Sequence, residues 1–154
     1  MSYRRWAVAI VFGVALLAPA AGAELAAWDA AKVGDIAKQL VPATQALYDT
    51  FYKQLPPMGG SGQTRDFSRL KLVIRHLKSE AQELSSALER GEGHDETFPI
   101  YESLMQDVRD AQEIGARIFA TEDLKQKASV ARGLLNQLGP HYDPEFETLV
   151  PVAR

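Results

Sequence analysis

Residues 66–91 contain a regular apolar pattern that restricts the fold more than any other part of the sequence. Successive apolar residues are separated alternately by three and four positions: Phe67, Leu70, Ile74, Leu77, Ala81, Leu84 and Leu88. This spacing places the side chains on one face of an α-helix, whereas strand side chains would alternate with a period of two. One long amphipathic helix is therefore predicted, with a cap at Thr64 or Asp66 and a left-handed Gly91 at its end.

Two segments repeat this pattern towards the C-terminus. The first follows a predicted cap at Asp95 or Thr97 and places Pro99 in the first turn, where the missing N–H costs no hydrogen bond. The second begins with Thr121 as the predicted cap, followed by acidic residues that favour the positive end of the helix dipole. The pair at 139–140, Gly-Pro, is predicted to end this last helix.

A fourth apolar stripe lies in residues 27–55 and is interrupted by Pro42. Proline inside a helix removes one hydrogen bond, so a kink or break is predicted near residues 38–41. Four stripes with short connections predict an all-α fold, an antiparallel up-down-up-down four-helix bundle over residues 24–140. Residues 141–154 are predicted to form a C-terminal tail that docks on the bundle.

Residues 1–23 have the composition of a cleavable signal peptide. Arg4 and Arg5 precede an apolar stretch, and small residues come directly before Glu24. Export to the periplasm is therefore predicted. The apolar stretch is shorter than the roughly 20 residues that a spanning helix needs, so no stable membrane insertion is expected after cleavage.

Charge and cysteine content narrow the function classes. Without Arg4 and Arg5, 15 basic residues face 20 acidic ones, and this acidic balance argues against nucleic acid as a partner. The chain has no cysteine, which excludes covalent c-type haem, cysteine-based zinc sites, iron–sulfur clusters and thiol catalysis.

Two histidines are the candidate ligands for a metal. The predicted topology brings the second connection and the end of the fourth helix to one end of the bundle, which places His94 near His141. Asp95 and Glu96 lie beside them, and imidazole with carboxylate suits zinc, copper, nickel or iron. The alternative is that both segments are solvated loops, in which His, Asp and Glu are ordinary residues.

The stretch QLGPHYDPEF, residues 137–146, together with the export signal and the bundle, resembles periplasmic cytochromes of the cytochrome c-prime and b562 type. In the c-prime type a haem-ligating histidine follows two attachment cysteines, and Gln137 and Pro140 occupy those positions here. The b562 type uses a methionine near the mature N-terminus, and residues 24–35 contain none. The resemblance therefore implies a relative without attached haem.

Non-covalent haem b remains the alternative cofactor, with His141 and either His94 or a methionine as axial ligands. Met58 is predicted at the opposite end of the bundle and Met105 within the third helix, so neither pairs readily with His141. No cofactor is the leading expectation.

Enzymatic activity is not expected, because no catalytic motif is found. The chain lacks a nucleophile elbow for Ser-His-Asp chemistry. It also lacks the Glu-x-x-His pairs of ferritin-like di-metal bundles. His76 and Glu80 are four residues apart on the predicted second helix and are interpreted as an outward-facing surface pair.

Apolar side chains also lie outside the four stripes: Tyr48, Tyr52, Leu72, Val73, Phe146, Leu149, Val150 and Val152. They predict either an interaction patch or a surface that the tail covers within the same chain. The leading hypothesis is an exported accessory or binding protein that contacts another periplasmic protein, or a second copy, through helix faces and the tail. The alternative is a carrier of haem or a transition metal at the end with His94 and His141. A third hypothesis, an envelope-stress chaperone, would require an exposed apolar cradle.

Overall fold

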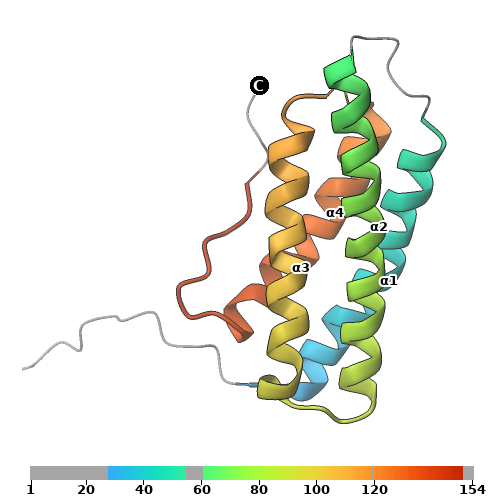
Figure 1. The fold of residues 1–154 in the computed structure, drawn as a ribbon. Helices are drawn as coiled ribbons and strands as arrows, with labels where there is room; N and C mark the ends of the chain where they lie inside the picture. The colour runs from blue at the N-terminus through green and yellow to red at the C-terminus, as the bar shows by residue number, and fades with distance from the viewer. Residues whose placement is uncertain (1–27, 55–60, 119, 151–154) are drawn as a thin grey trace, which may run out of the picture.

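The computed structural model describes residues 28–54, 61–118 and 120–150. In these ranges the chain is helical and contains no strand, which confirms the predicted all-α class. The elements are α1 (Ala30–Tyr52), α2 (Ser61–Glu89), α3 (His94–Gly115), α4 (Glu122–Leu138) and a 3-10 helix η1 (Gly139–His141) (Figure 1). The predicted signal peptide, residues 1–23, lies outside the described residues.

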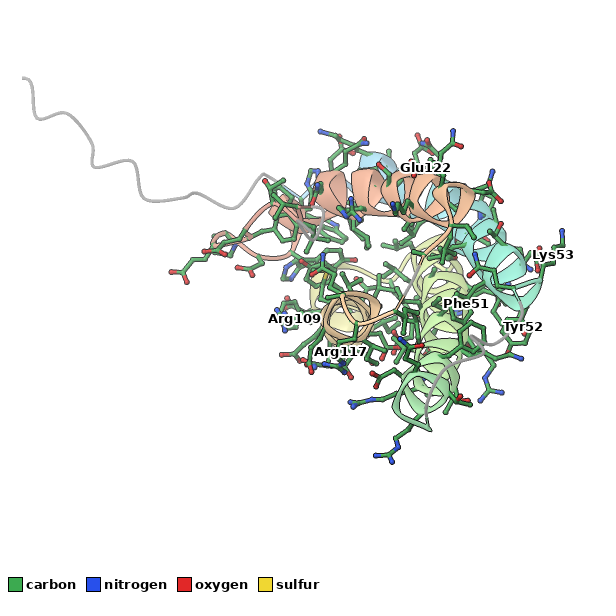
Figure 2. All side chains as sticks on the ribbon, turned by 90° about the horizontal axis from the view of Figure 1, so that it is seen from above. Phe51, Tyr52, Lys53, Arg109, Arg117 and Glu122 are labelled. Carbon is green, nitrogen blue, oxygen red and sulfur yellow. The ribbon has the colours of Figure 1, made fainter. Side chains whose placement is uncertain are left out.

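The helices do not all pack against one another to the same degree. Helix α2 packs against both α1 and α3, and α1 also packs against α4. Helices α3 and α4 have no comparable packing in the described part of the chain. Figure 2 views the molecule from above and shows α4 lying lengthwise, strongly inclined to α3, which is seen nearly end-on. The neighbours therefore follow the order α3, α2, α1, α4, and the side between α3 and α4 lacks direct helix packing.

The core consists of the apolar stripes read from the sequence. The seam of α2 is buried except for Leu88, which is half-buried, and the stripes of the other helices face it. Val73, predicted to lie off the seam, is also part of this core. Its burial follows from the position of α2 between two helices, because a helix with two neighbours buries a wider face than a single seam.

Two helices begin earlier than predicted. Helix α2 starts at Ser61, so Asp66 lies in its second turn and is not a cap; its carboxylate pairs with Arg117 Nε at 3.2 Å. Helix α3 starts after Gly93, and the Glu96 carboxylate accepts the Gly93 N–H at 3.0 Å. Thr97 is therefore inside the helix, where its hydroxyl donates to the Gly93 carbonyl at 2.7 Å. At α3, the side-chain hydrogen bonds of Glu96 and Thr97 to the Gly93 backbone place the first turn further towards the N-terminus than predicted.

Other helix boundaries agree with the sequence. Thr121 caps α4 by accepting the Leu124 N–H at 3.3 Å, and Gly91 has a left-handed φ of 85° at the end of α2. Of the predicted kink or break near residues 38–41, the break is wrong, because α1 continues through Pro42. Pro42 is exposed, so water can reach the Lys38 carbonyl that loses its helical donor.

Candidate functional site

A groove with a volume of about 750 Å³ occupies the side between α3 and α4. All four helices contribute to its apolar walls, which include Leu47, Leu70, Ile74, Leu77, Val108, Leu124 and Leu135. Several wall residues are nearly buried: Leu77 is 5% exposed, Val108 7% and Leu135 3%. The volume of the groove lies in the range of roughly 300–1,000 Å³ found for small-molecule sites.

The polar lining of the groove comes mainly from α4. Lys125 Nζ lies 3.5 Å from Glu122 Oε2, so these two opposite charges compensate each other. Arg132, two helical turns further along, is half-buried and has no hydrogen-bond or ion-pair partner among the described residues. The groove thus combines apolar walls with one uncompensated positive charge.

The groove could not be read from the sequence, because an apolar stripe shows which face of a helix is buried but not how far away its neighbour lies. One signal was present: several of the positions of α3 and α4 that line the groove are small, including Ala111 and Gly115 on α3 and Ala128 and Ala131 on α4. Facing small residues permit either a close helix approach or a space, and the inclination of α4 leaves a space here.

The predicted histidine-bearing end forms an aromatic cluster. The Trp28 ring lies edge-on to His94 and to Tyr142, with centroid distances of 5.3 Å in both cases. His94 also stacks on Tyr142 at 5.4 Å, and Tyr142 stacks on Tyr101 at 4.4 Å. These ring contacts thus join Trp28, two residues before α1, to the start of α3 and to the residue after η1.

His94 has the hydrogen-bond pattern of a metal-ligating histidine whose second ring nitrogen contacts a carboxylate. Its Nδ1 lies 2.8 Å from Asp95 Oδ1, and its Nε2 is buried without a partner among the described residues. An Nδ1–H donated to a carboxylate leaves Nε2 as a lone-pair donor, the tautomer used by metal-bound histidine. The Glu96 carboxylate, in contrast, accepts the Gly93 N–H and so stabilises the first turn of α3.

His141 is 5% exposed, and its Nδ1 is likewise buried without a partner in the described part of the chain. It is the neighbour of Tyr142, on which His94 stacks, so the two histidines share this end of the molecule. Among the described residues, no group of three or more His, Asp or Glu side chains is placed to hold a metal ion. Met105 lies in the core, and Met58 lies outside the described residues.

Tyr142 links this aromatic cluster to α3 through its hydroxyl group, which lies 2.8 Å from Thr97 Oγ1. Since the Thr97 hydroxyl donates to the Gly93 carbonyl, Tyr142 is the donor in this contact. Burial raises the pKa of Tyr142, and burial together with the nearby Asp143 carboxylate raises the pKa of Tyr101 to about 12. Both phenols therefore stay protonated at neutral pH.

The tail lies beside α3 and α4. The Asn136 side chain donates to the Leu149 carbonyl at 3.1 Å and accepts the Leu149 N–H at 2.8 Å. A second cavity of about 680 Å³ lies between α3 and the tail, walled by residues such as Phe98, Met105 and Phe146. Neither His94 nor His141 lines this cavity, but Phe98 and Tyr142, whose rings pack on His94, do.

The predicted interaction patch is divided by this arrangement. Leu72 is 48% exposed, whereas Val73 belongs to the core. Tyr48 and Tyr52 are half-buried on α1, with lysine ammonium groups of α2 at 4.5 Å and 4.0 Å from their ring centroids. The described part of the tail, residues 141–150, lies against α3 and α4 and leaves Leu72 exposed, so this part does not provide the predicted cover.

A pair of carboxyl groups lies between α2 and α3. Glu80 accepts a hydrogen bond from Ser103, while Glu80 Oε2 and Asp107 Oδ2 are buried without a partner in the described residues. Burial raises the pKa of both carboxyls. The Ser103 hydrogen bond lowers the pKa of Glu80, whereas the Asp107 carboxyl raises it further. At Asp107, His76 and then Glu80 oppose the increase. His76 is exposed, as predicted, but Glu80 faces Ser103 and Asp107, so the interpretation of His76 and Glu80 as a simple surface pair is incomplete.

Glu80→Gln is expected to stabilise the protein at pH 7 by on the order of 1 kcal/mol, because the amide can donate to Asp107 while still accepting from Ser103. Acid pKa values raised in the folded state mean that the wild type loses stability as pH rises from the ordinary carboxyl pKa of about 4 through the raised values. The gain should therefore disappear below about pH 3.5. Urea unfolding at several pH values measures it. Glu83→Gln, on the exposed face of α2, is the control, and an equal gain there would contradict the explanation.

Comparison with known protein families, with characterised proteins and with solved structures finds no match to this chain. None of the helices in the described ranges combines the length and apolar character needed to cross a membrane. The candidate sites are therefore interpreted from their own residues.

Proposed function

We propose that this chain is an exported, non-enzymatic binding protein of the periplasm, built as an up-down-up-down bundle that is opened between α3 and α4. The observation that carries the proposal is the 750 Å³ apolar groove on that side. The signal-like composition of residues 1–23 supports export. The volume of the groove suits a small molecule, whereas an unfolded client of a chaperone would need a broad exposed apolar surface.

Filling the groove tests this proposal. Ala128 lines the groove and is half-buried, so Ala128→Trp should place an indole in the space that a ligand would use. Nile red, a neutral apolar dye, is expected to bind the wild-type protein saturably, and the variant should bind it at least about tenfold more weakly. Fluorescence titration measures the change, and circular dichroism checks that the helices are retained.

Val130→Trp is the matched control, because Val130 is 54% exposed on the same helix and does not line the groove. It should bind Nile red as the wild type does. Equal affinity of all three proteins for the dye, or absence of saturable binding to the wild type, would contradict a binding role for the groove.

A second proposal is that the end with His94 and His141 holds a transition metal or haem b. Support comes from the two buried ring nitrogens without partners and from the Asp95 carboxylate behind His94. Imidazole donors suit zinc, copper, nickel and iron, and Asp95 would fix the tautomer of His94. A bound metal would supply Lewis acidity or a redox couple, and His94 and His141 would hold it.

This second proposal predicts stoichiometric metal, or a Soret band, in protein purified without a chelator or a histidine tag. His94→Ala and His141→Ala should each remove the signal, since each deletes one proposed ligand. His76→Ala serves as the control, because His76 is exposed on α2. A metal content that is unaffected by the first two variants would contradict the proposal.

A further inference from the structure

We infer that the ligand of the groove is a single-chain amphipathic carboxylate of the fatty-acid type, with its alkyl chain between α3 and α4 and its carboxylate at Arg132. The inference rests on the proposed binding role of the groove. It adds the chemical class of the ligand and the residue that selects it.

The shape of the groove favours an alkyl chain. The lining residues of α4 extend from Glu122 to Leu135, which corresponds to about 20 Å along the helix axis. A partner helix is roughly 10–12 Å across with its side chains. That width exceeds the width of an alkyl chain, and the groove volume of about 750 Å³ lies in the range of small-molecule sites. A flexible alkyl chain can follow the apolar lining along the groove.

The charge of the groove favours an anionic head group. Arg132 lines the groove and has no ion-pair partner among the described residues, so its charge is available to an anion bound there. Other arginines in the described ranges form ion pairs with carboxylates, unlike Arg132. Arg117 contacts Asp66 and Glu113, and Arg90 contacts Glu92.

Arg132 stands uncompensated although the whole chain has a net charge of −3. Its charge is therefore not the consequence of a generally basic surface. A carboxylate matches the planar fork of a guanidinium through two parallel hydrogen bonds.

The test compares dodecanoate with dodecan-1-ol, both below the concentrations at which they aggregate, by competition with Nile red at pH 7. These two probes share the alkyl chain and differ in charge. Dodecanoate is expected to bind the wild type at least tenfold more tightly than the alcohol. Arg132→Gln should remove this preference by weakening dodecanoate alone, and Arg132→Lys should retain part of it because the charge remains.

Lys127→Gln is the matched control, since it removes one positive charge from α4 at a position that does not line the groove. It should keep the tenfold preference. Equal binding of the acid and the alcohol to the wild type, or an unchanged preference in Arg132→Gln, would overturn the inference. Either result would leave the Nile red site and the proposed function standing, whereas failure of Nile red itself to bind would refute both.

Discussion

Tyr142→Ala is expected to lower the free energy of unfolding by about 3–5 kcal/mol, the usual cost of removing a fully buried aromatic side chain. Tyr142 is 2% exposed and contacts the rings of Trp28, His94 and Tyr101. Its loss would leave a cavity where Trp28, the start of α3 and the segment after η1 meet. The variant should therefore loosen three helix ends at once.

Tyr142→Phe separates the ring contacts from the hydrogen bond. It keeps the ring and removes only the donor to Thr97, so the expected cost is about 1 kcal/mol. Urea unfolding measures both variants. Trp28 fluorescence gives a local signal, because the only other tryptophan, Trp6, lies in the predicted signal peptide. A loss below about 1 kcal/mol for the alanine variant, with unchanged Trp28 emission, would refute this role of the cluster.

Gly139→Ala is expected to displace the tail and to cost about 2 kcal/mol, in the range found for overpacked sites. A Cβ atom at this position would overlap the Phe146 ring. Phe146 must then move, and the hydrogen bonds between Asn136 and Leu149 are held by the same docked segment. Urea unfolding measures the loss, and limited proteolysis should show faster cleavage within residues 143–150.

Gly133→Ala is the control on the same chain segment. Gly133 lies inside α4, and a Cβ there would meet nothing within 4 Å. The substitution should stabilise the protein by about 0.5–1 kcal/mol, because alanine loses less backbone entropy in a helix. Protease sensitivity of the tail should not change. If Gly139→Ala behaved as Gly133→Ala does, the close approach of Phe146 would not be required for tail docking.

The helices and much of the core could be predicted from the sequence, because buried apolar residues recur with the period of the helix. The seam from Phe67 to Leu84 and the cap at Thr121 lie where their chemistry predicted. The starts of α2 and α3 were predicted too far towards the C-terminus. Asp66 and Thr97 belong to residue types that are common both at N-caps and within the first turns of helices, so the sequence alone does not separate the two positions. The continuous path of α1 through Pro42 depends on the exposure of that residue, which a local pattern does not give.

The candidate site was less predictable than the fold. Topology alone brought His94 to the end of the molecule where His141 lies, but the burial of their ring nitrogens depends on how Trp28 and Tyr142 pack. The groove depends on the inclination of α4 relative to α3, which arises from the packing of α4 on α1. Inter-helix geometry of this kind follows from the fit of many side chains, and no single motif records it.

The measurement that tests the central claim most directly is a methyl NMR titration of the protein with dodecanoate. The account predicts saturable shifts at Leu77, Val108 and Leu135, which line the groove, with little change at Leu84, a fully buried core residue that does not. Shifts centred instead on Met105 and Leu149 would place the ligand under the tail. That result, or the absence of saturable shifts, would contradict a binding site between α3 and α4.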